Sequence, residues 1–325
     1  MVGSLKLSLS GGLLTGQRPS PCLLLGVNMY NEQELLGRIL DFKYKIIRQL
    51  GDGGMAYVFT AERLHIGDQV AVKILHPELA NDATKKRRFQ LEAYTTAAVK
   101  HPHVVSIFDY DETETGQPYL VLELLNGRTL ANYVQRGQHL SASRTVEIIT
   151  PICRGLNLAH QKGILHRDLK PSNIVLHKLE DGAEVVKLID FGIVKLLGED
   201  DNPLTQQGFV VGTPEYLSPE RYKGLTLDAR SDIYSLGILA YRMLTGRVPF
   251  SGRTATEILQ KHLKQPVPPL RLLNNSISEE VETVVLRALA KQPEDRQNTS
   301  IEFAYQLEEA CISSGDTLDH YSPSE

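Results

Sequence analysis

The first part of the chain alternates apolar and polar residues in short runs, which is the pattern of half-buried β-strands. Strands are predicted at residues 43–50, 70–75, 104–110 and 119–123. A Gly-rich turn at 51–54, followed by a β-branched run to Val58, predicts a tight strand–turn–strand. Residues 82–99 have helical spacing, with Asp82 as the N-cap. We expect an antiparallel sheet of about five strands covered by one helix.

After Asn126-Gly127 the spacing becomes mainly helical. A hairpin is the exception, because Asp181-Gly182 is a turn signal between two apolar runs. Helices are predicted at 130–135, 141–161 (with Pro151 inside), 228–245, 254–263, 277–290 and 299–311, and the hairpin strands at 174–176 and 185–188. The predicted class is α+β with two lobes, divided into a leader at 1–40, a sheet lobe at 41–125, a helical lobe at 126–312 and a polar tail at 313–325.

The leader is rich in Ser, Gly and Leu and carries only Lys6 and Arg18 as charges in its first 28 residues. Its apolar runs are short and broken by Gly and Pro, so a disordered segment fits better than a signal peptide. A sharper hypothesis is that Met29 is the true start. The intact mass of the protein from its native cell would decide, because a mass that includes residues 1–28 rules this out.

Composition and charge narrow the functional classes. The chain of 325 residues has a net charge of −4, which argues against a protein that binds nucleic acid by broad phosphate neutralisation. Three scattered cysteines, Cys22, Cys153 and Cys311, form neither a disulfide framework nor a metal cluster, so we expect a cytoplasmic protein. No run of about 18 apolar residues predicts a membrane span.

The segment Ile164–Asn173 concentrates candidate chemistry. It places an acid, a cation and an amide within six residues, at Asp168, Lys170 and Asn173. Pro171 removes a backbone donor and fixes its own φ, so the segment is predicted to be a loop. Loops on a rigid scaffold commonly carry catalytic residues.

Two features of the sheet lobe point to an anionic ligand, and each has a simpler alternative. The turn Gly51-Asp52-Gly53-Gly54 would bring backbone N–H groups close to a phosphate, but a Gly-rich hairpin without a ligand explains the same residues. Lys73 lies in an apolar strand, opposite its neighbours, and would need an anion if buried, whereas on an edge strand it would be solvated. Glu92 is a candidate partner, unless it is a surface glutamate.

In order, these stretches resemble the motifs of the bacterial, eukaryotic-like serine/threonine protein kinases. The resemblance covers roughly residues 40–311. The matching positions are Gly51–Val58, Val70–Lys73, Glu92, His166–Asn173, Asp190–Gly192, Ser218–Glu220, Asp232 and Arg296. The resemblance implies the bilobal protein kinase fold and a protein serine/threonine kinase that uses Mg²⁺ and ATP, with Mn²⁺ as an alternative metal.

The family pattern assigns roles around the phosphates. By resemblance, Lys73 would hold the α- and β-phosphates and Glu92 would orient Lys73. Asn173 and Asp190 would be the metal ligands, as suits a hard cation that prefers oxygen.

On the substrate side, Asp168 would accept or orient the hydroxyl proton and Lys170 would offset charge on the γ-phosphoryl group. Thr213 stands where the family bridges these two side chains with a hydroxyl, which favours serine and threonine over tyrosine as acceptors.

The nucleotide site follows from the same resemblance. Leu122 would be the gatekeeper, the backbone of Glu123 and Leu125 would bind adenine, and Val58 and Ala71 would cover it. The phosphate cradle is expected at Leu50, Gly51, Asp52, Gly53, Gly54 and Met55.

Further expectations concern a regulatory phosphorylation site and the residues that hold the site in place. Arg167 suits a phosphorylated residue in the segment 193–220, and Thr205 is the candidate. Related kinases carry a second threonine two residues later, but Gln207 stands there and cannot be phosphorylated, so activation at a single site is expected. Structural roles are expected for a Glu220–Arg296 ion pair, for Asp232 as acceptor of catalytic-loop N–H groups, and for His166 beneath Phe191.

The expected partners are ATP, protein substrates and a transient homodimer for autophosphorylation, without nucleic acid. The rival class is a non-catalytic pseudokinase scaffold, which usually lacks one of the residues at Lys73, Asp168, Asn173 or Asp190, all present here. A small-molecule kinase of the same fold is disfavoured by Ser218–Glu220 and Asp232.

Overall fold

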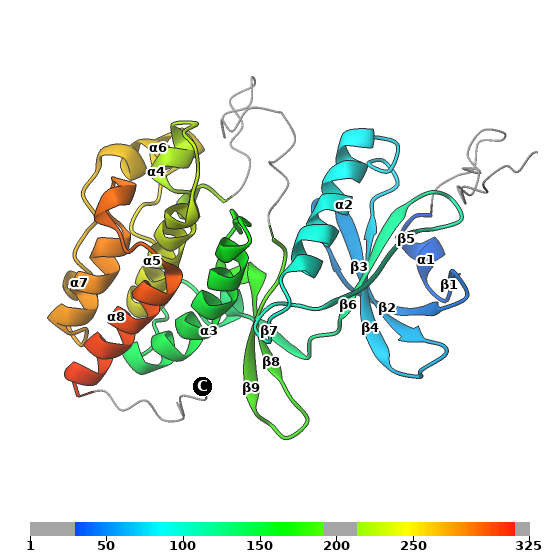
Figure 1. The fold of residues 1–325 in the computed structure, drawn as a ribbon, viewed down its shortest axis with the longest axis horizontal. Coiled ribbons are helices and arrows are strands. Elements are labelled where there is room, and N and C mark those ends of the chain that lie inside the picture. Colours follow the sequence, from blue (N-terminus) through cyan, green and yellow to red (C-terminus); the bar gives the residue numbers. More distant parts are fainter. Residues whose placement is uncertain (1–29, 192–212, 316–325) are drawn as a thin grey trace, which may run out of the picture.

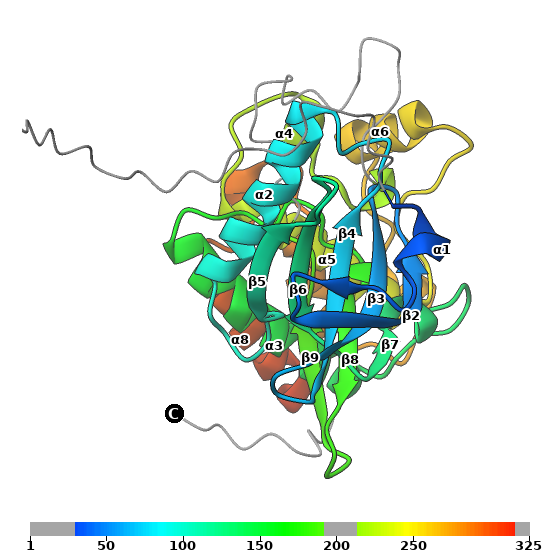
Figure 2. The ribbon, with the colours of Figure 1, turned by 90° about the vertical axis from the view of Figure 1, so that its right-hand side faces the viewer.

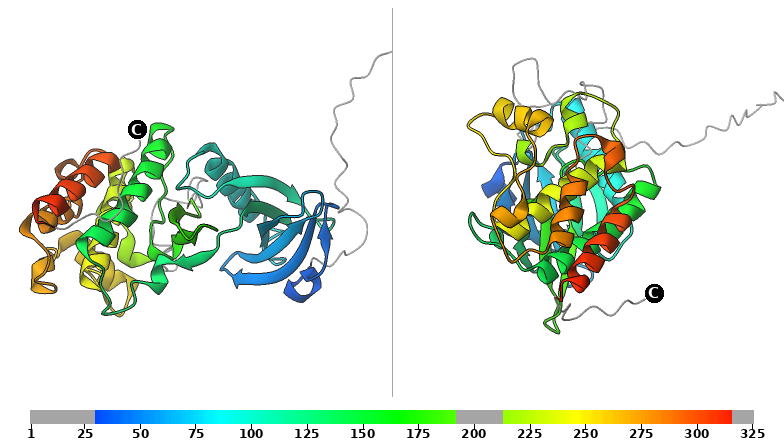
Figure 3. Two further views of the ribbon diagram at one scale, coloured as in Figure 1. Left: turned by 90° about the horizontal axis from the view of Figure 1, so that it is seen from below. Right: turned by 90° about the vertical axis from the view of Figure 1, so that its left-hand side faces the viewer.

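The computed structural model describes residues 30–191 and 213–315, which form two lobes side by side (Figure 1). One lobe is built on an antiparallel sheet and the other mainly on helices, so the predicted α+β class is confirmed. Figure 3 shows the two lobes from below and from the helical side. The chain crosses from the sheet lobe to the helical lobe between strand β6, which ends at Glu123, and strand β7, which begins at Gly127.

The sheet lobe holds six antiparallel strands in the order β1-β2-β3-β4-β6-β5. Figure 2 looks onto this lobe, with β5, β6, β4, β3 and β2 following one another across the view. The strands are β1 (Ile39–Leu40), β2 (Tyr44–Asp52), β3 (Ala56–Arg63), β4 (Gln69–Leu75), β5 (Ile107–Glu112) and β6 (Pro118–Glu123). Helix α2 (Ala83–Ala98) begins after Asp82, whose carboxylate accepts from the N–H groups of Thr84 and Lys85, as an N-cap should.

Strand β4 shows why the lobe has two different faces. Val70, Val72 and Ile74 are fully buried on one face, against Phe59 and Tyr119. Leu75 lies on the other face and packs with Phe89 and Ala93 of α2. Because successive strand residues alternate between faces, Lys73 lies on the α2 side, as the pattern predicts.

The expected disordered leader at 1–40 differs from the structure where the two can be compared. Asn31 caps helix α1 (Glu32–Leu35) in a capping box with Glu34, and β1 pairs with β2. Leu35 and Leu40 are buried against the sheet. Burial of these two side chains orders residues 31–40, so the leader prediction is wrong for that stretch. Residues 1–29, including Met29, lie outside the described part of the chain.

Strand β5 also begins later than predicted. The residues before it join the two lobes instead: Val105 N donates to Leu188 O (3.0 Å), and Leu188 N donates to His103 O (2.8 Å). Val104 forms an isolated bridge with Leu188, which belongs to strand β9.

The helical lobe surrounds helix α5 (Ala229–Thr245), most of whose side chains are buried. Gly237 allows α7 to approach α5 closely, because a Cβ at this position would lie 3.0 Å from the Cβ of Ala288. The other helices are α3 (Ala142–Gln161), α4 (Pro219–Tyr222), α6 (Ala255–Lys264), α7 (Glu279–Ala288) and α8 (Ser300–Ser313). Among the helices of the described ranges, none has the length and apolar character that a bilayer crossing requires.

Smaller elements complete this lobe. The predicted hairpin is present as β8 (Ile174–Lys178) and β9 (Glu184–Leu188), joined through Gly182, and β7 (Gly127–Thr129) adds a third strand. The predicted helix at 130–135 is only a 3₁₀ turn, η1 (Leu130–Asn132). The remaining 3₁₀ turns are η2 (Pro171–Asn173), η3 (Pro214–Tyr216), η4 (Leu270–Leu272) and η5 (Pro293–Asp295).

Candidate active site

The loop between α3 and β8 carries the acid, cation and amide that the sequence brings together. Lys170 Nζ donates to Asp168 Oδ2 at 2.7 Å. The Asn173 amide donates to the carbonyl oxygen of Asp168 at 2.9 Å and to its Oδ2 at 3.1 Å. Pro171 opens the turn η2, so the loop conformation agrees with the prediction. The amide nitrogen of Asn173 is thus occupied, and its Oδ1 is the atom left for a ligand.

A buried carboxylate holds the start of this loop. Asp232 of α5 accepts from His166 N at 2.8 Å and from Arg167 N at 2.9 Å. Burial opposes ionisation of Asp232, but hydrogen bonds from His160 and from the Arg167 N–H outweigh it and lower the pKa of this carboxyl. The expected role of Asp232 is confirmed. It also stabilises the left-handed backbone of Arg167, whose φ is +64°.

The loop between α3 and β8 packs against Phe191 through His166, as expected. The rings of His166 and Phe191 lie with centroids 4.8 Å apart, and both residues are fully buried. Burial lowers the pKa of His166, so the ring is neutral near pH 7. Arg221 of α4 adds a further connection, since its guanidinium donates to the carbonyl oxygen of Arg167.

Lys73 joins two carboxylates from different elements. Its Nζ lies 2.7 Å from Glu92 Oε1 on α2 and 2.9 Å from Asp190 Oδ1 at the end of β9. The Lys73–Glu92 pair was predicted, and the contact with Asp190 was not. Ile189 N donates to Asn173 O at 2.9 Å, so Asp190 follows directly on a residue bonded to the loop between α3 and β8. The two groups of polar side chains therefore meet between the lobes.

Lys73, Glu92 and Asp190 form a cluster in which the pKa of each side chain is shifted differently. Burial works against a charged Lys73, but Asp190 and Glu92 outweigh burial and raise the pKa of the ammonium. Burial raises the pKa of Glu92. Burial also disfavours the Asp190 carboxylate, but Lys73 overcomes this and lowers the pKa of Asp190. One cation faces two acids, and the Asp190 side chain remains 43% exposed, so the cluster has an acidic group accessible to a further cation.

The Gly-rich turn lies at the tip of the β2–β3 hairpin. A Cβ added at Gly51 or Gly54 would meet no atom within 4 Å, and neither residue has a positive φ. Glycine is therefore not required here by the fold, and the open space suits close approach of a ligand to the backbone. Ala56, the first residue of β3 after the turn, is buried beside Leu75.

The segment between the lobes fits a backbone-mediated role. Glu123 N donates to Ser106 O, and the Glu123 carboxylate pairs with Lys187 at 2.7 Å, so its side chain is occupied elsewhere. Ala71 pairs with Leu122 in the sheet, which brings those two side chains to the same face of the sheet. Leu50 and Val58 come from the two strands of the Gly-rich hairpin.

One expected contact does not form, and one expectation falls on residues outside the described ranges. Among the described residues, the Thr213 side chain makes no hydrogen bond to Asp168 or Lys170, which contact each other directly. Thr205, Gln207 and Gly192 lie outside the described residues.

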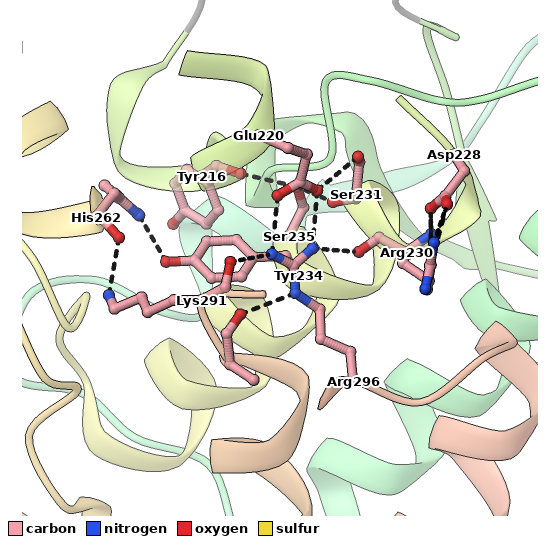
Figure 4. Close-up of polar contacts among 11 residues, drawn as sticks. Tyr216, Glu220, Asp228, Arg230, Ser231, Tyr234, Ser235, His262, Lys291 and Arg296 are labelled. Atoms are coloured by element: carbon pink, nitrogen blue, oxygen red, sulfur yellow. Dashed lines mark hydrogen bonds and ion pairs between the residues drawn. The ribbon is translucent and has the colours of Figure 1, made fainter. Parts of the chain in front are cut away.

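The expected structural ion pair is confirmed and is shown in Figure 4. Arg296 Nη1 and Nη2 each lie 2.8 Å from one oxygen of Glu220, and the Arg296 side chain is fully buried. Its remaining donors reach the carbonyl oxygens of Ala290, Arg230 and Lys291. Burial opposes the Glu220 charge, but Arg296 outweighs it and lowers the pKa of the carboxyl. This pair ties the end of the 193–220 segment to the helical lobe.

Comparison with known proteins decides the family. The sequence model of the protein kinase domain family matches residues 44–307. The chain belongs to the protein kinase family. It is 42% identical over 272 residues to the serine/threonine-protein kinase PknB of Mycolicibacterium smegmatis, and 42% identical over 267 residues to Pkn1 of Myxococcus xanthus. These alignments cover 82% of this chain but only 43% and 38% of the two relatives, so this kinase domain spans less than half of their length.

Solved structures confirm the protein kinase fold. The kinase domain of PknI from Mycobacterium tuberculosis superposes with a TM-score of 0.66 at 28% identity, over 84% of this chain and 98% of that domain. The predicted resemblance to bacterial serine/threonine kinases is therefore correct.

Proposed function

We propose that this kinase domain is a catalytically active protein serine/threonine kinase that transfers the γ-phosphoryl group of ATP to protein hydroxyls. The observation that carries the proposal is the meeting of Lys73, Glu92 and Asp190 with the Asp168–Lys170–Asn173 loop. Phosphoryl transfer depends mainly on positioning and on stabilisation of spread negative charge. These six side chains supply both. A pseudokinase usually lacks one of the residues at Lys73, Asp168, Asn173 or Asp190, and all four are present here.

Each residue has a distinct part in this proposal. Lys73, held by Glu92, binds the α- and β-phosphates. Asp168 orients the acceptor hydroxyl and takes its proton, and Lys170 offers an N–H to the γ-phosphoryl oxygens next to that carboxylate. A cation placed at the transferred group stabilises the transition state by about 2–4 kcal/mol in comparable sites.

We assign the metal to Asp190 and Asn173, with Mg²⁺ as the ion and Mn²⁺ as the alternative. Asp190 is partly exposed, and Asn173 has Oδ1 left over because its amide nitrogen is bonded to Asp168. No group of three or more His, Cys, Asp or Glu side chains in the described ranges could hold a metal alone. This fits an ion that takes few protein ligands and completes its shell with phosphate oxygens and water. When bound, the ion neutralises phosphate charge.

The remaining assignments concern selectivity and control. Leu122, Val58 and Ala71 surround adenine, which binds the backbone of Glu123 and Leu125. The Thr213 hydroxyl contacts Asp168 and Lys170 when a short Ser or Thr acceptor is bound. Phosphorylation of Thr205 in a transient homodimer activates the enzyme through Arg167, and we propose that the protein works in the cytoplasm, where ATP is available.

Incubation with labelled ATP, Mg²⁺ and dephosphorylated casein tests the proposal. The wild-type protein is expected to label itself and casein. Asp168→Asn should lower the rate by about 10²–10⁴, which is the usual contribution of a general base. Asp181→Asn, the same change in the exposed β8–β9 turn, should behave as wild type. Equal labelling by the wild type and Asp168→Asn would end the kinase proposal, and nucleotide binding without any labelling would favour the scaffold.

A further inference from the structure

His76 occupies an unusual place relative to the Gly-rich turn. The β3–β4 ladder ends at the pair Ala56–Leu75, so residue 76 stands one step beyond the ladder, beside the turn. His76 N donates to the carbonyl oxygen of Met55 at 2.9 Å. The carbonyl oxygen of His76 accepts from the N–H groups of Leu79 and Ala80, both at 3.0 Å. The backbone of His76 is therefore fixed on both sides.

The His76 ring reaches the same turn a second time. Its Nε2 lies 2.7 Å from the carbonyl oxygen of Gly53, which can only accept, so Nε2 carries the proton. Asp52 Oδ1 is 3.3 Å from the same nitrogen. The Tyr57 ring packs edge-on against the imidazole, with centroids 4.2 Å apart. With only 7% of its surface exposed, His76 holds one orientation.

These contacts fix the turn on both sides of Gly54, since the Gly53 and Met55 carbonyl groups both accept from His76. The C=O and N–H of one trans peptide unit point in opposite directions. The N–H of Gly54 therefore points away from His76. Within the described part of the chain, the N–H groups of Gly54 and Met55 have no hydrogen-bond partner. They remain available to an anion, such as the phosphate oxygens of a nucleotide.

We propose that His76 is a positioning residue for nucleotide phosphates, which acts by holding the Gly53 carbonyl so that the opposite face of the turn presents its N–H groups. The inference rests on the proposed function, because it takes the turn to be the phosphate cradle. The competing explanation is that His76 only fills space beside Tyr57. The two explanations differ in what they require of residue 76, since packing needs a ring and positioning needs a donor at the place of Nε2.

Two substitutions separate these explanations. Gln places its amide nitrogen close to where His has Nε2, whereas Asn places its amide nitrogen at the level of Nδ1 and is too short to reach Gly53. His76→Asn should raise the dissociation constant of a non-hydrolysable ATP analogue with Mg²⁺ about fivefold, the size expected for one lost hydrogen bond. His76→Gln should stay within about twofold of the wild type. The KM for casein should not change in either variant.

Hydrogen exchange of residues 51–57 without nucleotide provides a readout that needs no kinase activity. Exchange should be faster in His76→Asn than in the wild type, and near wild type in His76→Gln. Unchanged exchange in His76→Asn, or faster exchange with unchanged analogue binding, would overturn the positioning role. A wild-type protein that binds no nucleotide would instead defeat the proposed function.

One measurement needs no variant and covers the case in which His76→Asn does not fold. Nitrogen NMR of the His76 ring in the wild-type protein should show a neutral imidazole protonated at Nε2 or a doubly protonated ring. A neutral ring protonated at Nδ1 would contradict the bond to Gly53.

Discussion

Two clusters of charged residues lie at opposite ends of the segment that joins β9 to α4, and they differ in how complete they are. Arg296 and Glu220 balance each other, and the guanidinium donates to three carbonyl oxygens besides the carboxylate. Lys73 faces both Glu92 and Asp190, so one positive charge meets two acids, and Asp190 is partly exposed. A satisfied buried pair serves the fold. An unbalanced, accessible cluster is typical of a site that binds something more.

Removal of Arg296 should produce the largest loss of stability. Arg296→Met leaves the Glu220 carboxylate buried without its partner, which typically costs about 3–5 kcal/mol. Chemical denaturation measures the free energy of unfolding directly. The control is Arg271→Met, which removes an exposed pair with Glu279 and should cost less than about 1 kcal/mol. Similar losses for the two variants would refute a structural role for the Glu220–Arg296 pair.

Removal of Lys73 should lower activity strongly and stability only moderately. Lys73→Met keeps a similar length without charge, and labelling should fall about 10²–10³-fold, as when a preorganised donor is lost. Its free energy of unfolding should fall by less than half of the Arg296→Met value, because Asp190 can turn to solvent and because Glu92, whose pKa is raised by burial, can take up a proton. An active Lys73→Met protein, or one destabilised as strongly as Arg296→Met, would contradict the distinction between the clusters.

Part of the loss of folding stability in acid should come from residues beside the Glu220–Arg296 pair. His262 lies beside this cluster with Nδ1 2.8 Å from Tyr234 Oη, and burial, aided by the charge of Lys291, lowers the pKa of His262 to about 3 (Figure 4). Below pH 6.5 the His262 ring is protonated in the unfolded chain, whereas in the folded chain it is protonated only near pH 3.

Stability supplied by neutral His262 is therefore present above pH 6.5 and lost as the pH falls. The slope from this residue is at most about 1.4 kcal/mol per pH unit. His262→Gln should give a shallower decline of unfolding free energy between pH 6.5 and pH 4.5. An unchanged slope would show that His262 is not the group responsible.

The sequence predicted most residues of the candidate site because they follow strong local patterns. The alternation along β4 placed Lys73 opposite Val72 and Ile74, and helical spacing brought Glu92 to the same side. The ordered motifs identified Asp168, Asn173 and Asp190 without any structure. Their pairwise contacts could be predicted in part, since Lys73–Glu92 was expected and Lys73–Asp190 was not.

What the sequence did not predict depends on tertiary contacts. Helix α1 has four residues and β1 has two, which is too short for any periodic signal. Both elements form because Leu35 and Leu40 are buried against the sheet. His76 belongs to no motif, and its contact with the turn follows from the point where the β3–β4 ladder ends. A hydrogen bond from Thr213 to Asp168 was implied by resemblance alone and does not form among the described residues.

We propose that a divalent cation, together with nucleotide, completes the Lys73–Glu92–Asp190 cluster. Calorimetric titration of a non-hydrolysable ATP analogue, with and without Mg²⁺, into the wild type and Asp190→Asn measures whether Asp190 binds that cation. We predict that Mg²⁺ tightens binding to the wild type by about tenfold or more, equivalent to about 1.4 kcal/mol. This gain should disappear in Asp190→Asn. An equal effect of Mg²⁺ on both proteins would show that Asp190 does not bind the cation.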